Sequence, residues 1–254
     1  MNTDLFNLNG KRVLITGGAG DLGWAMVKGL AAFGASVVSI DLNQNRTSDI
    51  LGLRKSGYDV YEITSDISRR ENINNAFLDA KKLLKGEIEV LINSAGIQRR
   101  TVSENFSDED WDQVIAINLT ATFSFCKLAA NDMLKIGKGK IINIASMQSF
   151  IGGLTIPAYA ASKGGVSQLT KTLSNDWAGR GINVNAIAPG YMDTQLNTNL
   201  INNPTRNAEV MTRIPAGRWG VPDDLLGAAI FLASSASDYV SGAIIPVDGG
   251  FLGR

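Results

Sequence analysis

The sequence predicts a single α/β domain in which a doubly wound parallel sheet carries helices on both faces. Short apolar runs alternate with helical stretches along the whole chain, which predicts parallel strands joined by crossovers. A glycine-rich turn, 17–23, joins the first apolar run to the first helical stretch. No linker, internal repeat or low-complexity segment interrupts residues 1–254, so one domain is expected.

The expected strands are apolar runs, and the expected helices lie between them. The strands cover residues 11–16, 36–40, 58–63, 89–93, 140–145, 182–188 and 243–247. The helices run from the glycine turn to 33, up to 56, and over 69–85, 108–136 (one long helix or a pair), 157–179 and 222–234. Pro157 suits the first turn of its helix. Pro189 ends the sixth strand.

A polar stretch, 191–215, follows the sixth strand and is broken by Pro204 and Pro215. In open parallel sheets, ligands bind in the crevice beyond the carboxyl ends of the strands. A long polar segment at that place predicts a substrate lid, and residues 191–215 are called the lid segment below.

Composition narrows the functions that the chain can have. Apolar residues make up 44% of the 254 residues, enough for a substantial core. Lys plus Arg and Asp plus Glu both number 24, so net charge gives no argument for binding nucleic acid or a membrane surface. No apolar run is expected to span a bilayer, and the first ten residues lack the basic start and apolar middle of a signal peptide.

The counts of histidine and cysteine exclude several kinds of site. The chain has no histidine, which excludes a Ser-His-Asp triad, Cys-His catalysis and a His-ligated zinc site. No cluster of carboxylates has a clear metal-ligand spacing, so no metal is expected. Cys126, the single cysteine, is expected inside a helix as a small buried hydrophobe. The lack of an internal disulfide fits a cytoplasmic location.

The first strand, the glycine turn and the next helix form an arrangement that can bind a pyrophosphate. Backbone N–H groups and a helix N-terminus face the same point, and glycines permit a tight turn and close backbone approach. Asp41 ends the second strand about twenty residues further on, where an acid can accept the ribose hydroxyls of adenosine. A helix cap is the alternative role for Asp41.

Tyr159 and Lys163 lie four residues apart after Pro157, so they share one helix face. A nearby ammonium favours the phenolate and lowers the pKa of the tyrosine from about 10. Such a tyrosine can exchange a proton with a substrate oxygen near neutral pH. Ser146, after the fifth strand, could bind the same oxygen. Alone, a Tyr-x-x-x-Lys pair is more often part of a solvated helix face. The residues around the pair therefore decide whether it is catalytic.

Ser146, Tyr159 and Lys163 at this spacing resemble the active site of the short-chain dehydrogenase/reductase family, and the likeness covers essentially the whole chain. The resemblance implies four catalytic residues, Asn118, Ser146, Tyr159 and Lys163. It implies that Lys163 holds the nicotinamide ribose, and that Asn118, which lies in mid-helix, holds a water linking Lys163 to solvent. It also implies a homotetramer.

Further segments match the family's cofactor site. Residues 93–96 resemble its Asn-Asn-Ala-Gly segment, Asp66 matches its acid near the adenine, and residues 189–190 match its turn beside the nicotinamide. The residues expected at the cofactor are Gly17, Gly20, Asp21, Leu22, Gly23, Asp41, Leu42, Asp66, Ile67, Asn93, Ala95, Gly96, Tyr159, Lys163, Pro189, Gly190 and Met192.

Asp21 departs from the family pattern, Thr-Gly-x-x-x-Gly-x-Gly, because it stands where the middle glycine belongs. Gly20 comes one place early, as in the longer, epimerase-type branch. An acid that pointed inward would repel a pyrophosphate. We expect Asp21 to point outward at the helix start, where a negative charge suits the helix dipole.

A narrower likeness concerns the substrate. Segments 95–100, 145–149 and 214–220 resemble those of sugar-acid dehydrogenases of this family that act at the 5-position of gluconate-type acids. The implied reaction interconverts a secondary alcohol and a ketone on a small sugar acid. Arg99 and Arg100 follow the fourth strand, where a guanidinium could grip a carboxylate through two hydrogen bonds. Only one of them can easily face inward in an extended segment.

The remaining substrate contacts are expected from Ser146, Tyr159 and Gln148, whose amide could bind a sugar hydroxyl. For the two arginines, the alternatives are solvated loop positions or contacts within the tetramer.

The sequence favours NAD over NADP, because Asp41 would repel a 2′-phosphate and no Lys or Arg lies within 17–23 or directly after Asp41. Two other functions stay open. The glycine spacing suggests a nucleotide-sugar epimerase, although 254 residues leave little room for its extra substrate domain. A catalytically idle, cofactor-binding protein of this fold is the second, although the intact catalytic set argues against it.

Overall fold

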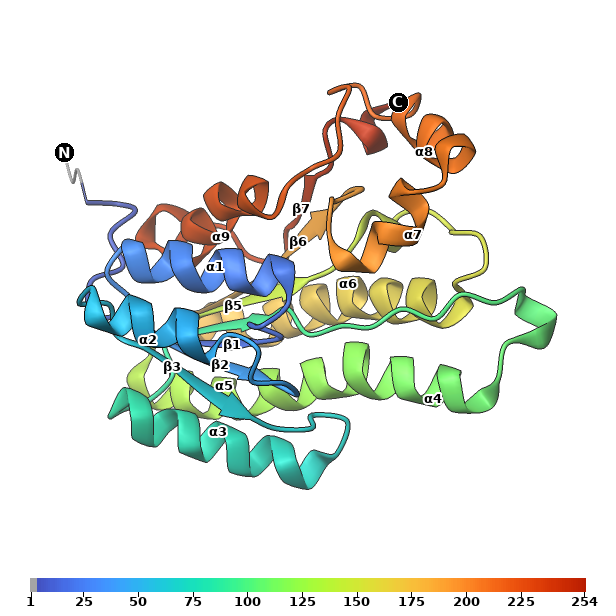
Figure 1. The fold of residues 1–254 in the computed structure, drawn as a ribbon. Helices are drawn as coiled ribbons and strands as arrows, with labels where there is room; N and C mark the ends of the chain where they lie inside the picture. The colour runs from blue at the N-terminus through green and yellow to red at the C-terminus, as the bar shows by residue number, and fades with distance from the viewer. Residues whose placement is uncertain (1–3) are drawn as a thin grey trace.

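The computed structural model describes residues 4–254 as a seven-stranded sheet between two layers of helices (Figure 1). The strand order is β3-β2-β1-β4-β5-β6-β7, with every neighbouring pair parallel. The strands are β1 (Arg12–Thr16), β2 (Ser36–Asp41), β3 (Val60–Thr64), β4 (Val90–Asn93), β5 (Gly139–Ile144), β6 (Ile182–Pro189) and β7 (Ile244–Val247). The predicted single-domain, doubly wound parallel sheet is confirmed.

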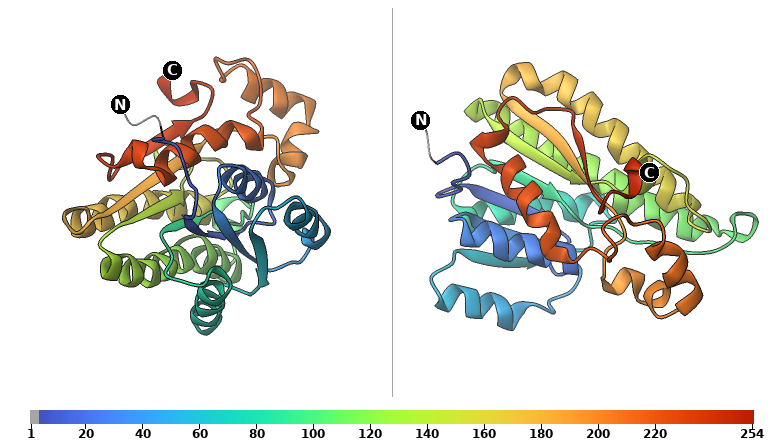
Figure 2. Two further views of the ribbon diagram at one scale, coloured as in Figure 1. Left: turned by 90° about the vertical axis from the view of Figure 1, so that its left-hand side faces the viewer. Right: turned by 90° about the horizontal axis from the view of Figure 1, so that it is seen from above.

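Three helices cover each face of the sheet (Figure 2). One layer holds α1 (Asp21–Ala32), α2 (Thr47–Lys55) and α9 (Leu226–Ala233), and the other holds α3 (Arg70–Leu84), α5 (Thr122–Ile136) and α6 (Pro157–Trp177). The predicted helix 222–234 is divided into a 3₁₀ turn, Pro222–Leu225, and α9. The lid segment contains two short helices, α7 (Thr198–Ile201) and α8 (Pro204–Met211), which lie beyond the end of β6 (Figure 1).

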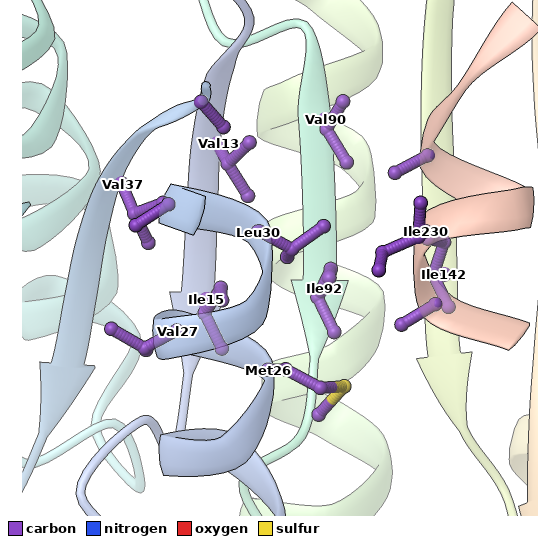
Figure 3. Close-up of a cluster of buried hydrophobic side chains, with 14 of the residues drawn as sticks. Val13, Ile15, Met26, Val27, Leu30, Val37, Val90, Ile92, Ile142 and Ile230 are labelled. Atoms are coloured by element: carbon purple, nitrogen blue, oxygen red, sulfur yellow. The ribbon is translucent and has the colours of Figure 1, made fainter. Parts of the chain in front are cut away.

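The core beneath α1 is built from branched side chains of the central strands and the inner face of that helix (Figure 3). Val13 and Ile15 of β1 are fully buried together with Val27 and Leu30 of α1. Burying one such side chain stabilises the fold by about 1.5–3 kcal/mol. This packing fixes β1 against α1, and therefore fixes the glycine turn between them at the carboxyl edge of the sheet.

The predicted long helix or helix pair over 108–136 is one helical run with an irregular centre. α4 (Asp108–Ile115) passes into a π-helical turn, Ala116–Ala121, and then into α5. Ser107 caps the start of α4, because its side chain accepts from the backbone N–H of Asp110. The π-helical turn contains Asn118 and buries it completely. Such turns occur frequently at functional sites.

The same run, Asp108–Ile136, has the length and composition of a membrane span, so the expectation that no run qualifies is wrong. Core helices can pass the same test. In this structure Phe125, Cys126 and Met133 are fully buried against the sheet and α3, which identifies α5 as a helix of the protein core.

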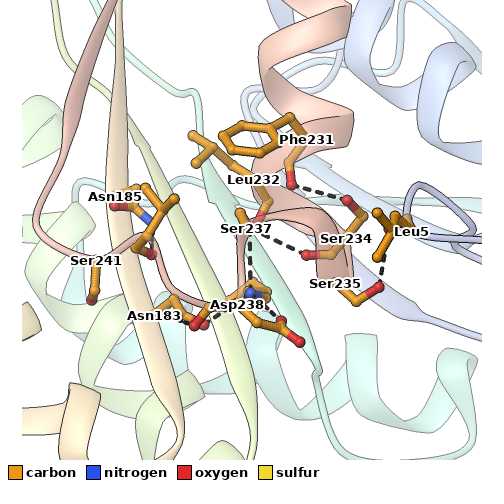
Figure 4. Close-up of polar contacts among 12 residues, drawn as sticks. Leu5, Asn183, Asn185, Phe231, Leu232, Ser234, Ser235, Ser237, Asp238 and Ser241 are labelled. Atoms are coloured by element: carbon orange, nitrogen blue, oxygen red, sulfur yellow. Dashed lines mark hydrogen bonds and ion pairs between the residues drawn. The ribbon is translucent and has the colours of Figure 1, made fainter. Parts of the chain in front are cut away.

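Polar contacts fix the connection from α9 to β7 (Figure 4). Ser237 Oγ donates to the carbonyl of Leu232 at the end of α9. The Asn185 amide, from β6, donates to the carbonyl of Val240 at 2.8 Å and accepts from the N–H of Ala243 at 3.0 Å. Buried backbone groups need such partners. These bonds hold the chain that leads into β7 against β6.

Candidate active site

The glycine turn after β1, called the glycine cradle below, brings backbone against backbone. Gly17 has φ +71°, and a Cβ there would lie 2.6 Å from the Cα of Ala95, so only glycine fits. A Cβ on Gly23 would overlap the carbonyl of Gly17. Gly20 is the N-cap of α1, and no side chain accepts from the N–H groups of its first turn. The helix N-terminus is therefore free to bind an anion.

Asp41 stands beside this cradle at the end of β2. One carboxylate oxygen accepts from the N–H of Ala19 at 3.0 Å, and the other accepts from the N–H of Leu42 at 2.7 Å. The N-cap of α2 is Arg46, so Asp41 is not a helix cap. An uncapped helix N-terminus for a pyrophosphate and an oriented carboxylate for a ribose fit a nicotinamide dinucleotide.

Two further residues expected at the cofactor differ in their surroundings. Asp66, after β3, accepts from the N–H and Oγ of Ser68, and these bonds hold the pKa of its carboxyl below the usual value. Asn93 is buried, and its amide donates to Asn143 at 2.8 Å and to the sulfur of Cys126 at 3.3 Å. The side chain of Asn93 therefore lies between β4, β5 and α5 with its Oδ1 unpartnered among the described residues, and a place for Asn93 at the cofactor stays a prediction.

Cys126 itself is fully buried, as expected. Burial raises the pKa of its thiol to about 12. The thiol is therefore neutral and inert near neutral pH.

Ser146, Tyr159 and Lys163 come together between the end of β5 and the start of α6. Ser146 caps a 3₁₀ turn, Met147–Ser149, and its Oγ accepts from the N–H of Gln148 at 3.2 Å. The Oγ of Ser149 donates to the carbonyl of Lys163 at 2.7 Å. That bond ties the Ser146 loop to α6, which carries Tyr159 and Lys163 on one face.

The surroundings of Tyr159 set how readily its hydroxyl releases a proton. Burial raises the pKa of Tyr159 above its usual value. The hydrogen bond from Ser146 and the positive charge of Arg100 lower that pKa. Burial outweighs both, so the lowered pKa that the sequence predicted for Tyr159 is not found.

Lys163 has a hydrogen-bond partner in β5 as well as Tyr159 nearby. Its Nζ donates to the carbonyl of Ile144 at 2.6 Å and lies 5.7 Å from the centroid of the tyrosine ring. Burial lowers the pKa of Lys163 to about 8. The last carbonyl of β5 is the partner that sequence spacing could not reveal.

Asn118 holds the segment after Gly96 in place. Its Oδ1 accepts from the N–H of Ile97 at 2.9 Å, and its Nδ2 donates to the Ile97 carbonyl at 3.0 Å and to Ser162 Oγ at 3.1 Å. A Cβ on Gly96 would lie 3.5 Å from Asn118 Oδ1 and 3.6 Å from Lys163 Nζ. Asn118 therefore lies close to Lys163, and its role in holding a water stays a prediction. Ser162 was not predicted, because a serine within a helix carries no signal of its own.

The two arginines after β4 have different surroundings. Arg99 Nε lies 3.1 Å from Asp110 of α4, and Arg99 Nη2 donates to Gln113 at 2.8 Å. Arg100 is exposed, forms no ion pair with any residue of the described chain, 4–254, and acts on Tyr159 through its charge. Arg99 is thus held against α4, and Arg100 is the arginine whose charge acts on Tyr159.

The last predicted contacts lie around the Ser146 loop and the end of β6. The Oε1 of Gln148 is buried and has no hydrogen-bond partner among the described residues, and its contact with a sugar hydroxyl stays a prediction. The N–H of Gly190 donates to Val247 at 3.0 Å, which places the Pro189–Gly190 turn beside β7. Met192 is buried and pairs with Gly220 at the base of the lid segment.

A pH experiment checks the burial of Lys163 in the cofactor-free protein. Its pKa falls from 10.5 in the unfolded chain to about 8 in the fold, so below pH 8 folding must bury a charge. Between these values only the unfolded state keeps the proton, and the free energy of unfolding should rise by about 1.4 kcal/mol per pH unit from this residue. Denaturant unfolding of the parent and Lys163→Met across this window should show the rise in the parent alone. Parallel curves would contradict the burial of a lysine with a lowered pKa.

Comparison with known proteins places this geometry in a family. Residues 17–252 match the model of a short-chain dehydrogenase family described as enoyl-(acyl carrier protein) reductase. The chain belongs to the short-chain dehydrogenase/reductase family. Membership means that a nicotinamide dinucleotide is its cofactor, in agreement with the cradle and the Asp41 carboxylate.

Its relatives include sugar-acid enzymes. 2-Dehydro-3-deoxy-D-gluconate 5-dehydrogenase of Bacillus subtilis is 44% identical, with 99% of this chain and 98% of that one covered. 5-Keto-D-gluconate 5-reductase of Escherichia coli is 40% identical, with 98% of each covered. The crystal structure of a gluconate 5-dehydrogenase from Burkholderia cenocepacia, in complex with NADP and tartrate, is 40% identical with a TM-score of 0.94, and covers 99% of this chain and 98% of that one.

Proposed function

We propose that this protein interconverts a secondary alcohol and a ketone on a small sugar acid of the gluconate or 2-dehydro-3-deoxygluconate type. One observation carries the proposal. The catalytic candidate Tyr159 lies within reach of Ser146 and of the positive charge of Arg100, at the carboxyl edge of a cofactor-binding sheet. A cation next to the proton-transferring group suits a substrate that carries its own carboxylate.

Each side chain has a distinct task in the reducing direction. A bound nicotinamide supplies the hydride. Tyr159 gives its proton to the ketone oxygen, while Ser146 donates a hydrogen bond to the same oxygen. The Tyr159 phenolate that remains is stabilised by the charge of Arg100. By family resemblance, Lys163 holds the nicotinamide ribose.

The substrate's carboxylate is the group that Arg100 would bind. A guanidinium orients a carboxylate through two parallel hydrogen bonds, and Arg100 has no ion-pair partner within residues 4–254 that would compete. Tartrate in the related gluconate 5-dehydrogenase is a hydroxy acid with two carboxylates, which supports an anionic substrate for that fold. The buried acceptor of Gln148 would take a hydroxyl of the sugar chain.

A substrate panel tests the proposal. Gluconate, 2-dehydro-3-deoxy-D-gluconate and 5-keto-D-gluconate are compared with uncharged polyols and ketoses of equal length, each with NAD(H) and NADP(H), by the absorbance of the reduced nicotinamide. The sugar acids should give the highest kcat/KM. Turnover confined to the uncharged compounds would refute the sugar-acid assignment, and absence of any turnover would favour the idle binding protein.

The preference for NAD over NADP stays a prediction. The related gluconate 5-dehydrogenase has NADP bound in its crystal structure, which argues for the opposite preference. Asp41 argues for NAD. Arg46 argues for NADP, because its Nε donates to the carbonyl of Ala19, whose N–H binds Asp41. We expect kcat/KM to be higher with NAD(H), and Asp41→Ser to shift the ratio toward NADP(H) by about tenfold or more, which is 1.4 kcal/mol.

Arg46→Ala is the matched variant for this test. If the parent already works better with NADP(H), the argument from Asp41 is wrong, and loss of that preference in Arg46→Ala would identify the phosphate contact.

The homotetramer, the cytoplasmic location and the lid role of residues 191–215 also stay predictions. Nothing in the geometry favours an epimerase.

A further inference from the structure

The carboxylate of Asp21 connects two parts of the chain that lie far apart in sequence. Its Oδ2 accepts from the backbone N–H of Gln195 at 2.8 Å, across 174 residues. Its Oδ1 lies 3.9 Å from the guanidinium of Arg46, which stacks over Trp24. Asp21 therefore does not point freely outward, as the sequence suggested. It joins the first turn of α1 to the lid segment.

The far end of the lid segment is held by apolar packing. Val210 of α8 and Ile214 are buried in one cluster with Met147, the residue after Ser146, and with Phe251. The lid segment thus touches both ends of the crevice. It reaches the glycine turn at Asp21 and the Ser146 loop at α8.

The two attachments differ in strength. α8 buries Val210, whereas α7 has no fully buried residue: its Leu200 packs only partly against the same cluster, and Leu196 is about half exposed. Within the described chain, 4–254, the hydrogen bonds of residues 194–203 stay inside the lid segment except for the bond to Asp21. Outside the lid segment, residues 194–203 are therefore held by the hydrogen bond to Asp21 and by the partial packing of Leu200, while the second half is held by fully buried side chains.

We infer that Asp21 is a positioning residue, which holds residues 194–201 closed over the cofactor site by accepting from Gln195. The family glycine pattern has no side chain at this position, so that pattern does not itself supply the contact. Closing a lid sequesters the site and slows the release of bound ligands. The expected change in KM and kcat rests on the proposed function, but the expected change in hydrogen exchange does not.

Three variants separate the hydrogen bond from the charge. Asp21→Asn keeps an acceptor oxygen and removes the charge. Asp21→Ala removes both. Asp49→Ala removes another acid that pairs with Arg46, at 3.5 Å, without touching the lid segment. Backbone hydrogen exchange of residues 194–201 is measured in the protein without added substrate. Loss of this hydrogen bond should raise exchange there about tenfold in Asp21→Ala.

Exchange in Asp21→Asn and Asp49→Ala should stay near that of the parent, and exchange in residues 204–214 should not change in any variant. The KM for the cofactor should rise about tenfold in Asp21→Ala, with kcat equal or higher because release is faster. Equal exchange in Asp21→Ala and the parent would overturn the inference. So would equal behaviour of Asp21→Asn and Asp21→Ala, because charge alone would then account for Asp21. If the proposed function fails, the exchange difference still stands.

Discussion

Replacing Tyr159 with phenylalanine is expected to lower kcat by about 10²–10⁴-fold, the usual contribution of general acid–base catalysis. Phenylalanine keeps the ring and its packing but cannot transfer a proton. The Kd for the cofactor should stay near that of the parent, because the glycine cradle and Asp41 lie elsewhere on the sheet edge. Single-turnover kinetics and cofactor titration measure the two quantities separately.

Tyr58→Phe is the matched control, because Tyr58 is exposed and precedes β3, at the opposite edge of the sheet. It should behave as the parent in both assays. A Tyr159→Phe enzyme whose kcat lies within about tenfold of the parent would remove the tyrosine from the chemistry.

Replacing Arg100 with alanine is expected to raise the KM for the best sugar acid by about 10- to 100-fold, as the loss of a charged, two-point hydrogen bond implies. The KM for an uncharged polyol should change little. The pKa of Tyr159 should also rise, because the nearby positive charge that lowers it is gone. A pH profile of the alcohol-oxidising reaction, which needs the deprotonated tyrosine, should then shift toward higher pH.

Arg99→Ala supplies the internal comparison, because Arg99 is held by Asp110 and Gln113 and should leave both KM values near the parent. Arg100 is not the carboxylate site if Arg100→Ala changes the KM for the acid and for the polyol equally, or if Arg99→Ala and not Arg100→Ala raises the KM for the acid.

The fold could be predicted well because strands and helices leave local patterns of apolar residues in the sequence. The expected strand 182–188 and β6 differ only by Pro189. The expected strand 58–63 begins two residues before β3 does. The start of β3 is set by its pairing with β2, in which Val60 lies opposite Val37. Such limits are set by the neighbouring strand and not by the residues themselves.

Side-chain partners across the sheet could not be predicted in the same way. The Lys163 ammonium binds the Ile144 carbonyl, 19 residues away, and Asn93 binds Asn143, 50 residues away. Alternation in an extended segment predicted that one arginine of the pair 99–100 faces inward, but only the position of α4 decides which. The contact between Asp21 and Gln195 depends on how the lid segment folds back, and no local pattern encodes that.

The transfer of a hydride to the ketone of a sugar acid can be followed directly. Reduced nicotinamide cofactor, labelled with deuterium on either face of its transferable position, is incubated with 5-keto-D-gluconate and the enzyme, with Tyr159→Phe alongside. From one of the two labelled cofactors, the hydroxy acid formed should carry deuterium at the former ketone carbon, and Tyr159→Phe should form almost none. Reduced acid without deuterium from either cofactor, or equal labelling by Tyr159→Phe, would contradict the mechanism.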